Sequence, residues 1–218
     1  MLEAMQKRHS VRKYLDTPLS NDHTEGLEKE IARCNKEGNL HFQLITNEPK
    51  AFGSFLAHYG MFHNVTNYIA CIGKKSNDLE EKCGYYGEQL VLYAQKLGLN
   101  TCWVYLTYKK VKNTFTILDD EQLVIVIAIG YGENQGYPHK NKPLSSLCNL
   151  SEESPEWFKQ GMDAVLLAPT AINQQKFYFT QIEDTVEAIA KKGPCSKIDL
   201  GIVKYHFELG ANYNFKWK

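Results

Sequence analysis

The order of apolar segments along the chain restricts its fold more than any other feature of the sequence. Segments with the apolar spacing of helices are mixed with short apolar runs typical of strands, and the two kinds do not alternate regularly. A doubly wound sheet requires a regular succession of strand, helix and strand, because its parallel strands are joined by crossover helices. The irregular order therefore predicts an α+β fold.

Helices are predicted from apolar stripes and from residues typical of helix ends. The clearest stripe runs from Leu90 to Leu97, and Gly98 ends it. Near the C-terminus, Ser196 and Asp199 have the spacing of a capping box, which predicts a helix start. The predicted helices cover residues 2–7, 22–38, 90–97, 109–118 and 154–169, and a last one begins at residue 196.

Short apolar runs predict strands, and one polar segment predicts a long loop. Residues 132–149 are rich in Gly, Asn, Pro and Lys, so they are expected to form a functional loop or an arm over another surface. The predicted strands cover residues 40–46, 68–73, 101–106, 123–131, 176–182 and 185–190.

Length, charge and cysteine content exclude several classes of protein. A chain of 218 residues is short for two domains, so a single domain over residues 1–218 is expected. Lys and Arg equal Asp and Glu at 25 each, so no overall field favours nucleic acid or an anionic membrane. No signal peptide and no bilayer-spanning run are recognised. The six scattered cysteines, without a CxxC pair, fit a cytoplasmic location.

Motifs for several common chemistries are not fulfilled. Gly130, Gly132 and Gly136 follow a predicted strand, but their spacing does not satisfy the dinucleotide-binding GxGxxG fingerprint. The sequence has no Walker loop, no HExxH and no GxSxG, and its seven histidines lack metal-ligand spacing. We therefore expect no metal and no side-chain nucleophile paired with a base.

The segment Arg8–Tyr14 has side chains that suit a charged ligand. In an extended conformation, Arg8, Ser10 and Arg12 point to one side, and Val11 points to the other. A guanidinium can hold a phosphate with two parallel hydrogen bonds, and a hydroxyl can donate a third. The row therefore suits a phosphate at one end and an electron-rich group at the other. A solvated basic stretch at the terminus is the alternative interpretation.

The same segment resembles the Arg-x-Ser-x-Arg opening of the nitroreductase family of flavoproteins. Residues 84–103 are similar to that family's long central helix and the strand after it, and residues 123–132 are similar to a later strand end. Lys142-Pro143-Leu144 resembles the family's Lys-Pro-Leu, so the resemblance covers residues 1–147 in the family's order. It implies a nitroreductase-like fold, with a central, mainly antiparallel sheet flanked by helices.

The main departure from the family pattern is a relocated motif. Members carry Ala-Pro-Ser-x-x-Asn-x-Gln-Pro-Trp after the first long helix, but residues 34–42 lack it. A similar motif lies at residues 168–177, with Lys176-Phe177 in place of Pro-Trp. This arrangement resembles a divergent branch of nitroreductases in which a second helix–motif–strand unit, here residues 154–210, follows the first.

The resemblance implies FMN as cofactor and assigns its ligands. Arg8 and Ser10 would bind the phosphate, and Arg12 would approach the N1 and C2 carbonyl edge of the flavin ring. Backbone groups at Trp103 and Val104 would face the N5 edge. The remaining implied ligands come from the later part of the chain, with Lys140 and Lys142 at the phosphate and Pro169, Thr170 and Asn173 along the ring. Loop charges or helix-terminal roles are the alternatives for these later residues.

The resemblance also implies a reaction. NAD(P)H would deliver hydride to flavin N5, and an electron-poor acceptor such as a nitroaromatic or a quinone would then be reduced, without a catalytic side chain. Another FMN enzyme on this scaffold, of the dehalogenase or flavin-fragmenting type, is one alternative. A non-enzymatic flavin or small-ligand binding protein is another, suggested by Lys176-Phe177. The family forms homodimers with flavin at the interface, so a homodimer is implied, while a self-sufficient monomer stays open.

Overall fold

The computed structural model describes residues 1–53 and 60–218, and the chain divides into two compact units. Unit 1 consists of Met1–Gln6, Glu80–Glu88 and Pro138–Lys218. Unit 2 consists of Lys7–Leu79 and Gln89–Tyr137. That residues 1–218 form a single domain remains a prediction.

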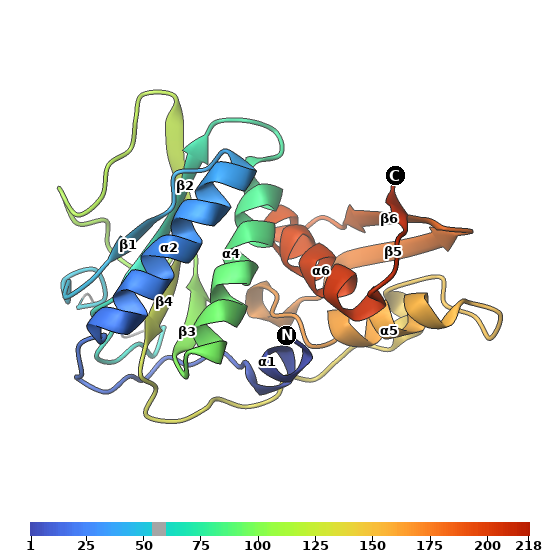
Figure 1. Cartoon of the computed structure of the whole chain (residues 1–218), viewed down its shortest axis with the longest axis horizontal. Helices are drawn as coiled ribbons and strands as arrows, with labels where there is room; N and C mark the ends of the chain where they lie inside the picture. The colour runs from blue at the N-terminus through green and yellow to red at the C-terminus, as the bar shows by residue number, and fades with distance from the viewer. Residues whose placement is uncertain (54–59) are drawn as a thin grey trace. The chain divides into compact units, whose positions relative to one another are not determined.

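Unit 2 is built on a four-stranded antiparallel sheet (Figure 1). The spatial order of its strands is β1-β2-β4-β3, and β4, the longest, lies inside the sheet because its apolar run is buried. The strands span Gln43–Ile45 (β1), Tyr68–Lys74 (β2), Asn100–Val104 (β3) and Glu121–Gly130 (β4).

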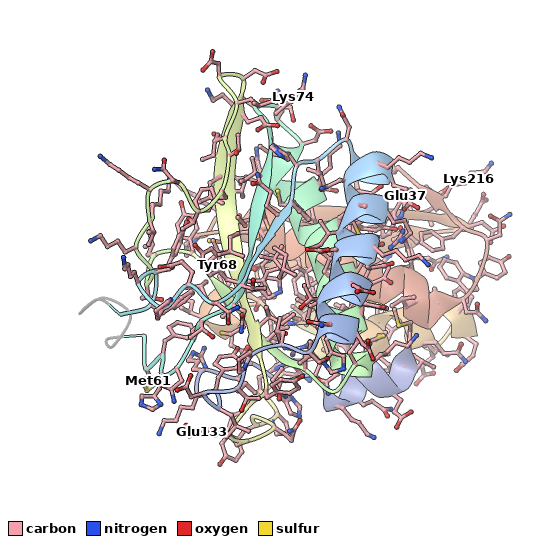
Figure 2. All side chains as sticks on the ribbon, turned by 60° about the vertical axis from the view of Figure 1, so that its left-hand side comes forward. Glu37, Met61, Tyr68, Lys74, Glu133 and Lys216 are labelled. Carbon is pink, nitrogen blue, oxygen red and sulfur yellow. The ribbon has the colours of Figure 1, made fainter. Side chains whose placement is uncertain are left out.

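Both faces of this sheet are covered. Helices α2 (Asn21–Gly38) and α4 (Leu79–Lys96) run along one face, where Leu27 and Ala94 pack with Ile129 (Figure 1). On the other face, side chains of β2, β3 and β4 pack with Val11, Tyr14 and residues of the loops. Lys74 and Glu133 lie at opposite ends of the sheet, and Tyr68 lies between them (Figure 2).

Unit 1 contains a three-stranded sheet and two packed helices. Strands β5 (Phe177–Ile182) and β6 (Thr185–Ala190) form an antiparallel hairpin, and β7 (Lys216–Trp217) pairs with β6 in parallel. The other elements are helices α1 (Leu2–Lys7), α5 (Glu156–Val165) and α6 (Ser196–Ala211), and the 3₁₀ turns η1 (Leu144–Ser146) and η2 (Ala171–Asn173).

Two close approaches explain why glycines lie in the helices of unit 1. A Cβ atom built on Gly161 of α5 would lie 2.5 Å from the ring of Phe207 on α6. A Cβ atom on Gly201 of α6 would overlap the backbone oxygen of Glu81 on α4. Because Gly161 lacks a side chain, the backbone of α5 can lie against the Phe207 ring. Because Gly201 lacks one, the backbone of α6 can lie against the backbone of α4.

The structure corrects four predictions about helices. The helix predicted over residues 90–97 already begins at Leu79, and the helix predicted over residues 154–169 spans Glu156–Val165. Residues 109–118 form no helix, because their backbone groups bond to other segments: Lys109 N donates to Ala51 O, and Thr116 N donates to the Gln43 side chain. The predicted capping box at Ser196 is also wrong. Cys195 is the N-cap residue, without a side-chain cap bond, and the Asp199 carboxylate bonds elsewhere.

The α+β class itself is confirmed, and the predicted strands are found with ends shifted by up to three residues. Within the described part of the chain, no helix combines the length and the apolar character needed to cross a bilayer.

Candidate functional site

The segment Arg8–Tyr14 lies beside β3 in unit 2. Ser10 forms a parallel bridge with Thr101, and Val11 N donates to Thr101 O at 3.0 Å. The backbone N–H of Glu133 donates to Lys13 O, so the segment lies at the end of the sheet that Glu133 marks in Figure 2. These bonds confirm that the segment is extended and add it to the sheet beyond β3.

The predicted ligands of this segment act on the electrostatics of Cys102 of β3. Burial raises the pKa of the Cys102 thiol above its ordinary value. The positive charge of Arg12, a hydrogen bond from Ser10 and the positive charge of Arg8 lower that pKa in part. Because Ser10 is paired with Thr101, Cys102 lies in register with Val11, and both residues belong to the apolar core on one face of the sheet.

The two arginines differ in exposure. Arg8 is 3% exposed, whereas Arg12 is exposed and Ser10 is half-buried. A charge that is taken out of water needs polar partners or a counter-charge, because desolvation of an ion is costly. The alternative of a solvated basic stretch therefore does not hold for Arg8.

Trp103 and Val104 lie on the strand that this segment flanks. They pair with Ile127 and Val126 of β4, the side chain of Val104 is buried, and that of Trp103 is half-buried. Unit 2 thus brings together the first half of the predicted site residues: Arg8, Ser10, Arg12, Trp103 and Val104.

The other predicted site residues lie together in unit 1. The Lys142 ammonium donates to Gln174 O at 2.6 Å, and Asn173 Nδ2 donates to Lys140 O at 2.8 Å. The hydroxyl of Thr170 accepts from Gln175 N at 3.1 Å. We call residues 168–177 the motif turn. Unit 1 thus brings the motif turn, with Pro169, Thr170 and Asn173, together with Lys140 and Lys142.

The motif turn is held by three residues that were not predicted as site residues: Asp199, Gln174 and Gln175. Asp199 of α6 accepts hydrogen bonds from Ala171 N and from the side chain of Gln174. Gln175 donates to Lys140 O and to the Asn173 side chain, and accepts from Lys142 N. Gln175 is the glutamine of the relocated motif and could have been found from it, whereas no local signal identified Asp199.

The carboxyl of Asp199 is in an unusual electrostatic setting. Burial raises its pKa from the ordinary value of 3.8 to about 6, and the bonds from Gln174 and Ala171 N oppose part of this shift. Asp199 is 2% exposed, so α6 holds this carboxyl in a poorly solvated place. Across residues 1–53 and 60–218, no three His, Cys, Asp or Glu side chains gather in a way that could hold a metal ion.

Comparison with solved structures identifies the same fold in other proteins. A protein from Thermotoga maritima, described as a putative nitroreductase, has a TM-score of 0.67 and 22% identity, over 96% of this chain and 82% of its own. A putative nitroreductase from Desulfovibrio desulfuricans, solved in complex with FMN, has a TM-score of 0.53 and 18% identity, over 71% and 96%. A putative NADH dehydrogenase/NAD(P)H nitroreductase from Parabacteroides distasonis has a TM-score of 0.53 and 21% identity, over 70% and 97%.

No curated protein matches the chain. A family model does: the model of the family described as "Putative TM nitroreductase" matches residues 1–211. The resemblance inferred from the sequence motifs and the nitroreductase-like α+β fold are thereby confirmed. The chain therefore belongs to the Putative TM nitroreductase family.

Proposed function

We propose that the chain is an FMN-dependent oxidoreductase that transfers reducing equivalents from NAD(P)H to an electron-poor acceptor such as a nitroaromatic or a quinone. Family membership supports the general class of activity. The observation that carries the assignment to this chain is the almost complete burial of Arg8 in a segment that Ser10 joins to β3. Bound FMN would supply hydride acceptance and donation at its ring, chemistry that side chains do not offer.

The side chains of Arg8 and Ser10 fit a phosphate group. Arg8 can offer parallel N–H bonds to phosphate oxygens, and the Ser10 hydroxyl can add a further one. Because Arg8 is almost fully buried, its attraction to a phosphate dianion is screened less than that of an exposed arginine.

Arg12 suits the ring end of the same ligand. Its exposed guanidinium follows Ser10 by two residues in the extended segment, so it can act on a different part of the ligand than Arg8 does. A fixed positive charge beside the ring favours the form that carries extra negative charge, which tunes a flavin toward reduction. Backbone groups at Trp103 and Val104 are proposed for the N5 edge.

The motif turn is proposed to contact the ring through Pro169, Thr170 and Asn173, with Lys140 and Lys142 at the phosphate. The bonds from Lys142 to the backbone oxygens of Gln174 and Gln175 give this lysine a second task, which is to hold the turn. We propose a homodimer, following the family, and a cytoplasmic location.

The binding-protein alternative rested on Lys176-Phe177, and this departure has a structural explanation. Phe177 starts β5, is 1% exposed and packs edge-on against Phe179. Lys176 O accepts a hydrogen bond from the backbone N–H of Lys191, the residue that follows β6. The two residues therefore serve the hairpin of unit 1.

The phosphate assignment is tested by comparing FMN with riboflavin, which lacks the phosphate. In Ser10→Ala we expect the Kd for FMN, measured by flavin fluorescence, to rise about tenfold, with the Kd for riboflavin within roughly twofold of wild type. Lys13→Gln removes a charge from an exposed neighbour and should change neither value. Equal FMN affinity in Ser10→Ala and wild type would contradict the assignment.

A further inference from the structure

The motif turn has a backbone conformation that two of its residues do not favour. Ile172, Asn173 and Gln175 have φ angles of 47°, 55° and 44°, in the left-handed region. Asparagine adopts this region readily, whereas for Ile172 and Gln175 it costs roughly 1–2 kcal/mol each, and it is least suited to the β-branched isoleucine. Such a turn persists only where its surroundings fix it.

The carboxylate of Asp199 bonds on both sides of the left-handed pair Ile172-Asn173. Its Oδ1 atom accepts from Ala171 N at 2.9 Å, and its Oδ2 atom accepts from Gln174 Nε2 at 2.8 Å. Ala171 and Gln174 flank the left-handed residues Ile172 and Asn173. The amide of Gln174 also donates to Pro194 O at 2.6 Å, so it is tied to the loop before α6 as well.

Burial separates the residues that hold the turn from those that it presents. Asp199 is 2% exposed and Gln174 is 8% exposed, whereas Ile172 is 88% exposed and Asn173 is exposed too. The side chain of Asn173 is oriented from both sides, because Nδ2 donates to Lys140 O and Oδ1 accepts from Gln175. The turn is thus fixed from its buried side and offers its other side to a ligand.

We propose that Asp199, acting through Gln174 and the backbone of Ala171, is a positioning residue that holds Thr170 and Asn173 in place for the flavin ring. The inference rests on the proposed function, since it needs a flavin that the motif turn contacts. An asparagine at position 199 cannot replace the carboxylate, because its amide would turn an N–H toward one of two donors. The assignment places a residue outside the motif in the binding machinery.

The test compares Asp199→Asn with Asp163→Asn, the same change at an exposed position of α5 in the same unit. We expect the Kd for FMN to rise about tenfold in Asp199→Asn and to stay within roughly twofold of wild type in Asp163→Asn. At saturating FMN, the visible circular dichroism of the bound flavin should also change in Asp199→Asn. This signal reports the surroundings of the ring, which a loss of stability elsewhere does not alter.

A second variant keeps the test decisive if Asp199→Asn does not fold. Gln174→Met removes the bond between Gln174 and Asp199 but leaves the bond from Ala171 N, so we expect a smaller rise in Kd of about threefold. Wild-type Kd and dichroism in both variants would overturn the positioning role and leave the proposed function standing. Failure of the wild-type protein to bind FMN would overturn both.

Discussion

Gly201 allows the backbones of α6 and α4 to touch where the helices cross. Replacing it by alanine has two opposite effects on stability: alanine favours the helix, but its Cβ atom collides with the backbone of α4. Alanine is favoured over glycine inside a helix by about 1 kcal/mol. Against this, the new Cβ would lie 2.6 Å from Tyr85 N and would overlap Glu81 O. Ordinary contact needs about 3.5 Å, so the helices must separate by roughly 1 Å. Because both obstacles are backbone atoms, no side-chain rotation relieves them, and the overpacking cost should lie at the upper end of its usual range, at about 3 kcal/mol. Subtracting the helix preference of about 1 kcal/mol leaves a net loss of about 2 kcal/mol.

We therefore expect Gly201→Ala to lower the free energy of unfolding by about 2 kcal/mol, measured by urea denaturation with circular dichroism. Gly26→Ala in α2 is the control. Its Cβ would lie 2.9 Å from the hydroxyl of Tyr93, the far end of a side chain that can move, so the helix preference should prevail and stability should stay equal or rise by up to about 1 kcal/mol. Equal stability of Gly201→Ala and wild type would refute the close crossing of α4 and α6.

Two further predictions concern buried ionisable side chains in unit 1. The folded pKa of Asp199 is raised from 3.8 to about 6, so the protonated side chain stabilises the fold at low pH, and this stabilisation is lost as the pH rises through about 6. Between pH 3.8 and about 6, the free energy of unfolding of the wild type should therefore fall by about 3 kcal/mol relative to that of Asp199→Asn. A difference between the two proteins that stays constant with pH, measured by denaturation, would contradict the burial of this carboxyl. Glu88 and His206 are both fully buried and bonded at 2.9 Å, so Glu88→Ala should destabilise the fold by about 3–5 kcal/mol in thermal denaturation, while an unchanged Tm would show that the pair is not buried.

The parts of the fold that could be predicted are those that depend on local patterns. The hairpin of β5 and β6 follows from two apolar runs around Glu183-Asp184, and the register pairs Ile182 with Thr185 across that turn. Arg8–Tyr14 was expected to be extended, and its bridge between Ser10 and Thr101 agrees with this. The partner of that bridge lies far along the chain, so only the hairpin is determined by neighbouring residues.

The parts that could not be predicted depend on contacts distant in sequence. The spacing of Ser196 and Asp199 is that of a capping box, yet the Asp199 carboxylate bonds to Ala171 and Gln174 because the fold brings the motif turn to α6. The segment 109–118 was predicted as a helix from its basic composition alone. Val111 and Phe115 pack against the core of unit 2 without forming a helix, because distant partners such as Gln43 and Ala51 determine the path of the backbone.

The most direct test of the proposed function is the visible absorbance of the purified protein reconstituted with FMN, recorded before and after NADPH or NADH is added without oxygen. The account predicts flavin bands that bleach on addition of the nicotinamide and return when a quinone or nitroaromatic is added. Bound flavin whose bands persist with both nicotinamides, or a protein that cannot be reconstituted with FMN, would contradict it.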